Sequence, residues 1–215
     1  MTEVIAFSTR DEWLKARAQK IGGSDASCIV GMNPYKTNQD LYLEKTGVVT
    51  PEDIGGKDFV RYGVQAEPIL RQLFGIDHPE IQITYTENNM FMNPDYPWAH
   101  ASLDGWLTDK DGRLGVLEIK TTNILQSMAK EKWHDRIPDN YYIQILHYMM
   151  VTGAEFAVLK ALLRFDYDGI YEQIREYWIE RSEVEQDIEE LIRAERKFWE
   201  AMQAGRTPDL VLPQI

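Results

Sequence analysis

Residues 102–120 of the chain read SLDGWLTDKDGRLGVLEIK, and this stretch decides the fold. Two partly apolar segments within it flank Asp111-Gly112, a dipeptide that is typical of the turn of a β-hairpin. Residues i and i+2 of a strand point to the same face, so Glu118 and Lys120 project together, away from the apolar residues that alternate with them. A hairpin that turns at Asp111-Gly112 is expected to bring Asp104 alongside Glu118.

Such a hairpin would place two carboxylates and an ammonium group at one spot between apolar segments. Burying these charges costs free energy unless something compensates them. A hard divalent cation does so, and Mg²⁺ typically takes one or two protein carboxylates together with phosphate oxygens of a substrate. The alternative is that Asp104 is only a turn residue, while Glu118 and Lys120 form an ordinary ion pair in an edge strand. Because the pattern is short and common, the spacing alone leaves both interpretations open.

The composition limits the class of protein and the cellular compartment. The single cysteine, Cys28, excludes an internal disulfide and a cysteine-cluster metal site. The 215 residues hold no apolar run long enough for a membrane span, and the N-terminus does not resemble a signal peptide. We therefore expect a soluble protein of a reducing cytoplasm.

The charge is negative overall but unevenly distributed. Lys and Arg number 23 against 35 Asp and Glu, which gives a net charge of −12 and argues against a sequence-independent nucleic-acid coat. Residues 172–200 alone carry ten acidic and five basic side chains. Other stretches are locally basic, so any contact with DNA must be local.

The periodicity on both sides of the hairpin predicts one α/β domain over residues 1–215, with a mixed central β-sheet flanked by helices. The Thr9-x-x-Glu12 capping box predicts the start of the first helix, and Ser24-Asp25 are expected to cap the second. This second helix is expected over residues 26–30, and further helices are expected from Asn38 to Gly47 and over 58–74, 140–151 and 182–204. The strands are expected over 81–85, 90–92, 98–107, 113–120, 156–165 and 171–179.

Five parts of the chain form a series of motifs. They are Arg17-x-x-x-Ile21-Gly22-Gly23-Ser24-Asp25, Tyr62-Gly63-Val64-Gln65-Ala66-Glu67, the pair Ala101-Ser102-Leu103-Asp104-Gly105 and Leu117-Glu118-Ile119-Lys120, Tyr141-x-x-Gln144-x-x-x-Tyr148, and Phe198-Trp199. In this order they resemble the PD-(D/E)XK nuclease superfamily, specifically the phage-type alkaline exonucleases around bacteriophage lambda exonuclease and the YqaJ-like viral recombinases. One departure is Leu103, which occupies a position that is usually proline in the family.

The resemblance implies a restriction-endonuclease-like fold and a metal-dependent active site. It assigns a divalent cation, Mg²⁺ or Mn²⁺, to Asp104, Glu118 and the backbone carbonyl of Ile119, with Glu67 joining directly or through water. Lys120 would orient the attacking water and help to deprotonate it. The absence of zinc-binding histidine spacings and of a Walker loop is consistent with this type of site.

The resemblance also assigns residues to the substrate. Gln144 would hold the attacking water or the scissile phosphate, and its alternative is a satisfied polar residue on a buried helix. Arg17 and Ser24 would hold the 5′-phosphate of a DNA end, although Ser24 alone is also a simple helix cap. Further basic residues that could follow the DNA backbone, or be ordinary surface charges, are Lys20, Lys36, Lys130, Lys132 and Arg136.

The resemblance therefore implies a 5′→3′ exonuclease of phage-type recombination in the cytoplasm of a bacterial host. It would degrade one strand of linear double-stranded DNA to mononucleotides and leave a 3′ single-stranded overhang. The family also implies a homotrimeric ring and a single-strand annealing protein as partner. Two alternatives remain: a structure-specific or restriction-like endonuclease, and a non-catalytic protein that binds DNA ends.

Overall fold

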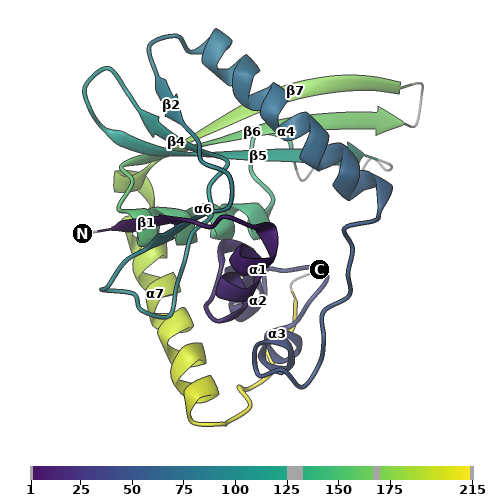
Figure 1. Cartoon of the computed structure of the whole chain (residues 1–215), viewed down its shortest axis with the longest axis vertical. Coiled ribbons are helices and arrows are strands. Elements are labelled where there is room, and N and C mark those ends of the chain that lie inside the picture. The colour runs from purple at the N-terminus through teal and green to yellow at the C-terminus, as the bar shows by residue number, and fades with distance from the viewer. Residues whose placement is uncertain (1, 125–132, 167–169, 214–215) are drawn as a thin grey trace.

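The computed structural model describes residues 2–124, 133–166 and 170–213. A five-stranded mixed sheet forms its centre, with the strand order β2-β4-β5-β6-β7 (Figure 1). Only the central pair, β5 and β6, is parallel. The strands are β2 (Gln82–Thr84), β4 (Gly105–Thr108), β5 (Leu114–Ile124), β6 (Phe156–Asp166) and β7 (Ile170–Glu180).

The predicted hairpin is confirmed as β4 and β5. The two strands pair antiparallel with Gly105 opposite Leu117, so Asp104 lies next to Glu118 at the end of the ladder. Asp109 closes the turn, because its Oδ1 accepts the N–H groups of Asp111 and Arg113, both at 2.9 Å.

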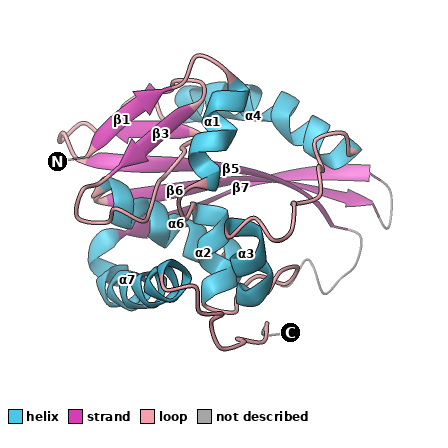
Figure 2. Cartoon of the chain, turned by 60° about the horizontal axis from the view of Figure 1, so that its bottom comes forward, coloured by secondary structure: helices cyan, strands magenta, loops and turns pink. Residues whose placement is uncertain are grey.

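Helices cover both faces of the sheet (Figures 1 and 2). One long helix, α4 (Asp58–Asp77), lies across one face. The other face carries α6 (Asp139–Thr152), which connects the parallel strands, and α7 (Arg181–Gln203). On this side also lie α1 (Arg10–Ala18), α2 (Gly23–Ile29), α3 (Asn38–Lys45) and a small antiparallel sheet of β1 (Glu3–Ala6) and β3 (Asn89–Met92).

The alternation along β5 divides the interior into two apolar clusters. Leu117 and Ile119 pack with Leu70 and Phe74 of α4 on one face of the sheet. Val116 belongs to the larger cluster on the opposite face, which includes buried residues of α2, α6 and α7. The apolar orientation predicted for Leu117 and Ile119 is thus confirmed, and Glu118 and Lys120 emerge on the side of α6.

Several predicted boundaries are wrong. Gly22, not Ser24-Asp25, is the N-cap of α2; Ser24 lies in the first turn, and the Asp25 carboxylate accepts the Gly22 N–H at 3.0 Å. Thr37, not Asn38, caps α3. The strand predicted over residues 98–107 begins only at Gly105, and its first part forms isolated bridges at Ala99 and Ala101.

Two further differences concern the ends of elements. Helix α4 continues to Asp77, with Pro68 inside it, and β1 has no counterpart in the prediction. None of the helices in the described part of the chain is long and apolar enough to cross a membrane.

Candidate active site

A cavity of about 650 Å³ lies at the end of the β4–β5 ladder. Side chains from both layers of helices and from the sheet reach it. The structure therefore brings together residues that are more than 120 positions apart in the sequence. Its lining includes Arg17 of α1, Ser24 of α2, Glu67 of α4, Asp104 before β4, Glu118, Ile119 and Lys120 of β5, and Gln144 of α6.

Glu118 is the most buried carboxylate of the cavity, with an exposed fraction of 2%. Its Oε1 accepts a hydrogen bond from Lys120 Nζ at 2.5 Å and another from Gln144 Nε2 at 2.8 Å. Its Oε2 has no hydrogen-bond partner among the described residues. The neighbouring Asp104 is fixed by the N–H of Ile119, which donates to Oδ2 at 2.8 Å. One buried carboxylate oxygen thus remains available to a ligand.

Burial raises the pKa of three carboxyl groups in this cavity, those of Glu118, Glu67 and Asp104. Loss of solvent, followed by repulsion from Asp104, raises the pKa of Glu118 to about 8 despite the opposing effect of Lys120. The same two causes raise the pKa of Glu67 to about 7, against the effect of Arg71. Loss of solvent also raises the pKa of Asp104. The cavity therefore favours added positive charge.

Lys120 remains an ammonium group in this setting. Burial opposes its charge, but attraction to Glu118 and Asp104 outweighs that effect and raises the pKa of Lys120. Its side chain is 22% exposed, and Nζ lies 5.1 Å from the centre of the Tyr141 ring. It can therefore act as a fixed positive charge and hydrogen-bond donor, but not as a free base.

Ser24 lines the cavity because α2 packs closely against α6. A Cβ atom on Gly23 would lie 2.5 Å from Cε1 of Tyr148 and 2.9 Å from Cγ of Gln144, so only glycine permits this approach. Gln144 is itself held by Tyr148, whose hydroxyl accepts from Nε2 at 2.8 Å. The predicted glycine turn and the predicted glutamine helix are thus parts of one contact.

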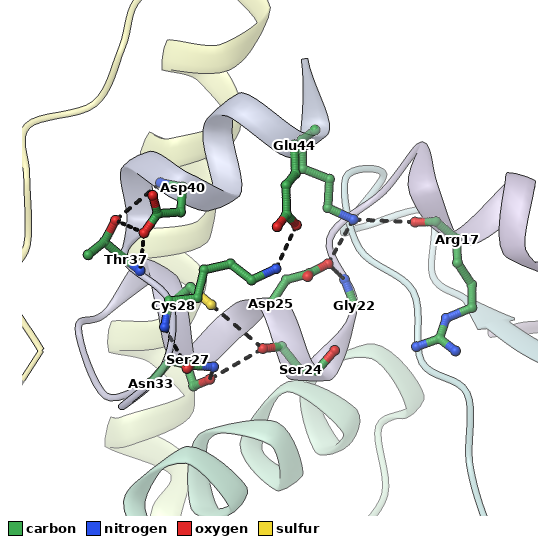
Figure 3. A network of polar contacts seen from close by, with 12 residues as sticks. Arg17, Gly22, Ser24, Asp25, Ser27, Cys28, Asn33, Thr37, Asp40 and Glu44 are labelled. Carbon is green, nitrogen blue, oxygen red and sulfur yellow. Dashed lines mark hydrogen bonds and ion pairs between the residues drawn. The ribbon is translucent and has the colours of Figure 1, made fainter. Parts of the chain in front are cut away.

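Arg17 approaches the same space from α1. Figure 3 shows its guanidinium group and the Ser24 hydroxyl extending toward the space between α1 and α2. The guanidinium lies 4.2 Å from the centre of the Trp13 ring. No carboxylate in the described ranges lies within ion-pair distance of Arg17, whereas the nearby Lys45 is paired with Asp25 at 2.7 Å. Arg17 is therefore a cation that can receive an anionic ligand.

The sequence did not single out Arg71, although it is central to the cavity. Its guanidinium donates to the Glu67 carboxylate and to the backbone carbonyl of Asp104, and it lies 3.4 Å from the centre of the Tyr85 ring. The spacing of four residues between Glu67 and Arg71 on one helix is the signal that could have identified it. Arg71 links the only α4 carboxylate of the cavity lining to the metal-binding segment expected at Asp104.

The five basic residues that could contact the DNA backbone lie outside this cavity or outside the described residues. Lys20 donates to the carbonyl of Pro97, and burial lowers the pKa of its amine. Lys36 pairs with Glu44 at 2.6 Å, and Arg136 is exposed. Lys130 and Lys132 fall outside the described ranges. A role for these five residues in DNA binding stays a prediction.

A match to a known protein family covers most of the chain. The family of the YqaJ-like viral recombinase domain matches residues 12–155. A curated relative, the uncharacterized protein YqaJ of Bacillus subtilis (strain 168), is 32% identical over 218 residues. The alignment covers 97% of this chain but 62% of the relative, so the chain spans about three fifths of that protein.

Solved structures with the same fold include alkaline exonucleases. The alkaline exonuclease LHK-Exo of Laribacter hongkongensis superimposes with a TM-score of 0.63 at 17% identity, over 91% of this chain and 93% of that chain. Its complex with dAMP gives a TM-score of 0.62 at 17% identity, over the same shares of the two chains. These likenesses confirm the predicted restriction-endonuclease-like fold.

Proposed function

Because the chain belongs to the YqaJ-like viral recombinase family, we propose that it is a divalent-metal-dependent deoxyribonuclease that degrades linear double-stranded DNA from its 5′ ends. In this proposal residues 1–215 form one nuclease domain. The observation that carries it is the Oε2 of Glu118, which is buried beside Asp104 and Lys120 in the cavity and has no partner in the part of the chain that the structure describes. A closed structural ion pair would leave no such oxygen.

The residues of the cavity fit a divalent cation. Asp104, Glu118 and the carbonyl of Ile119 would hold it, with Glu67 joining directly or through water. Among the described residues, no three His, Cys, Asp or Glu side chains form a metal cluster by themselves, and Glu67 is paired with Arg71. The oxygen ligands and the raised carboxyl pKa values favour a hard cation such as Mg²⁺ or Mn²⁺. A bound cation would stabilise the negative charge that develops on the phosphate and on the leaving 3′ oxygen.

The side chains on the α6 side of the cavity would prepare the attacking water. The Lys120 ammonium lowers the proton affinity of a water molecule beside it and so favours deprotonation. Gln144 Nε2 donates to Glu118 and Tyr148, which leaves the amide oxygen to accept from a water molecule; holding the scissile phosphate would require Nε2 to give up one of these two bonds. Positioning of the water and of the phosphate is the main contribution of these groups.

Arg17 and Ser24 would determine the polarity of digestion. They line the same cavity as Asp104 and Glu118 but come from α1 and α2. A terminal 5′-phosphate held there would place the first phosphodiester at the carboxylates, so that each cycle releases a mononucleotide. The complementary strand would remain as a 3′ overhang.

The family also suggests the biological context of the enzyme. We propose a homotrimeric ring around DNA, a single-strand annealing protein that receives the overhang, and action in the cytoplasm of the bacterial host during phage-type recombination. The basis for this part is family membership alone.

Incubation with DNA of two topologies tests the proposed activity. Linear duplex with 5′-phosphates and covalently closed circular duplex are compared with Mg²⁺ and with EDTA, and Asp104→Asn is the control variant. We expect mononucleotides from the linear duplex only, only with Mg²⁺, and not with the variant. Cleavage of the closed circles would instead identify an endonuclease. Binding of linear ends without hydrolysis in Mg²⁺ or Mn²⁺ would identify a non-catalytic end-binding protein.

A further inference from the structure

The side chain of Asn89, at the start of β3, forms two hydrogen bonds with the backbone of Leu103, directly before Asp104. Its Oδ1 accepts the Leu103 N–H at 2.8 Å, and its Nδ2 donates to the Leu103 carbonyl at 2.9 Å. A further bond from Nδ2 to the Thr86 carbonyl, at 2.8 Å, fixes the amide itself. Asn89 has an exposed fraction of 6%, so these bonds are shielded from water. The amide thus acts as a short piece of strand paired with Leu103.

The backbone carbonyl of Asn89 also binds α1, the helix that carries Arg17. The carbonyl of Asn89 accepts from Trp13 Nε1 at 2.9 Å and from the Ser102 hydroxyl at 2.8 Å. Trp13 is the ring over which the Arg17 guanidinium lies, at 4.2 Å. Asn89 therefore connects the cation on α1 with the segment that carries Asp104.

The residue that Asn89 binds has a backbone N–H that needs a partner. Leu103 has this N–H, which a proline at the same position would lack. Leu103 is 3% exposed, so an N–H left without a partner at this position would be costly. The Asn89 side chain accepts this N–H and, through its second bond to the Leu103 carbonyl, fixes the backbone at this residue.

We propose that Asn89 is a positioning residue that sets the location of Asp104 relative to Arg17. Its side chain fixes the Leu103 backbone and thereby the Asp104 carboxylate, and its carbonyl fixes the ring beneath Arg17. Because the roles of Asp104 and Arg17 rest on the proposed function, the primary test measures the position of Asp104 without using hydrolysis.

The primary measurement is amide hydrogen exchange at Ile119, whose N–H donates to Asp104 Oδ2 at 2.8 Å. We expect Asn89→Ala to speed exchange at this amide about tenfold, since the carboxylate that protects it is then held less firmly. In the same variant we expect Mg²⁺ to bind about tenfold more weakly, as is typical when a residue that supports a metal ligand is removed.

The chain offers a matched control in Asn38. Its buried amide also spans a backbone segment, because Nδ2 donates to the Asp209 carbonyl at 2.7 Å and Oδ1 accepts the Val211 N–H at 3.0 Å. Asn38→Ala should lower the melting temperature by about as much as Asn89→Ala, roughly 5 °C for each. It should leave both Ile119 exchange and Mg²⁺ affinity as in the wild type.

A second variant separates positioning from general loss of stability. Leu103→Pro removes the N–H that Asn89 accepts, so combining it with Asn89→Ala removes both partners of this bond and leaves no unsatisfied donor at residue 103. The Leu103 and Thr86 carbonyls still lose Nδ2 as donor, so we expect the double variant to recover part of the protection at Ile119 that Asn89→Ala loses. Equal Ile119 exchange in Asn89→Ala and Asn38→Ala, or no recovery in the double variant, would overturn the proposal. Absence of nuclease activity in the wild type would overturn the proposed function and leave this exchange comparison decisive.

Discussion

Two lysines, one partly exposed and one buried, lie on the adjacent parallel strands at the centre of the sheet. Lys120 of β5 is paired in register with Ala161 of β6, and Lys160 is paired with Ile119. Lys160 is 0% exposed, and its Nζ binds Asp77 at 2.8 Å and Glu176 at 2.6 Å. Lys120 binds only Glu118 among the described carboxylates and faces the cavity.

The two lysines differ in whether every oxygen of the carboxylate they bind has a hydrogen-bond partner. At Lys160 the second oxygen of Glu176 meets His78 Nε2 at 2.7 Å, so each carboxylate oxygen of Glu176 has a partner. At Lys120 one oxygen of Glu118 has none in the described part of the chain. Burial of charge alone therefore does not identify a functional site. A buried charge group with an unused ligand atom, facing a cavity, is the more specific sign.

The largest expected effect is the loss of hydrolysis in Lys120→Met. Removal of a group that positions and acidifies the attacking water typically costs about 10²–10⁴ in rate. Burial already raises the pKa of Glu118 to about 8, so this carboxyl can take up a proton when the ammonium is removed, and the free energy of unfolding should fall less than in Lys160→Met. Single-turnover hydrolysis of linear duplex, with Mg²⁺ binding as control, measures this effect. Near-wild-type turnover would remove Lys120 from the active site.

The matching substitution Lys160→Met should lower the stability of the fold and leave the rate of hydrolysis unchanged. It leaves Asp77 and Glu176 without their shared cation, and breaking a buried ion pair from one side costs about 3–5 kcal/mol. Because Asp77 is 44% exposed, we expect the lower end, about 3 kcal/mol. Urea unfolding measures this loss, while hydrolysis per folded molecule should stay at the wild-type rate. A loss of activity without a loss of stability would show that the Lys160 cluster is not merely structural.

Arg17 extends the comparison to a cation that has no carboxylate partner in the described ranges. If it binds a terminal phosphate, a 5′-hydroxyl end lacks about two charges, and initiation on it should be slower by roughly a hundredfold. Arg17→Ala should shrink this difference by slowing only the phosphorylated substrate. Strands labelled at the 3′ end, compared with each type of 5′ end, report both rate and direction. Equal initiation on both ends by the wild type would exclude a phosphate site at Arg17.

The same two lysines show what the sequence could reveal. Lys120 is predictable because Glu118, Lys120 and the turn at Asp111-Gly112 are close together in the sequence, and strand periodicity places them in space. Lys160 sits in a continuous apolar strand, and its partner Asp77 is 83 residues away. No local pattern links the two residues.

The errors in the element boundaries also have local causes. Ser24, Asp25 and Gly22 all suit the first positions of a helix, so propensity cannot decide which of them is the cap. Strand β1 has four residues that are mostly exposed, and it forms only by pairing with β3. The role of Asn89 has no local signal in the sequence, because folding alone brings its partner Leu103 to it.

A third buried charge pair, between His147 of α6 and Glu195 of α7, gives the smallest predicted effect. Both side chains are fully buried; His147 Nδ1 lies 2.7 Å from Glu195 Oε1, and Nε2 lies 2.8 Å from the His100 carbonyl. Since a carbonyl only accepts, Nε2 carries a hydrogen. Trp98 Nε1 donates to the other Glu195 oxygen at 3.1 Å, so a further proton is shared between Nδ1 and Oε1.

This geometry predicts how the pair contributes to stability at different pH values. Burial lowers the pKa of His147, but attraction to Glu195, the bonds to Glu195 and His100, and the charge of Asp25 outweigh it, so the pKa is raised. The folded state then holds a proton that the unfolded chain releases near its ordinary value of 6.5. The stabilisation is therefore complete below that pH and declines as the pH rises through the folded pKa. Melting temperatures from pH 5 to 9 should fall more steeply for the wild type than for His147→Gln, and parallel profiles would show that the pair shares no such proton.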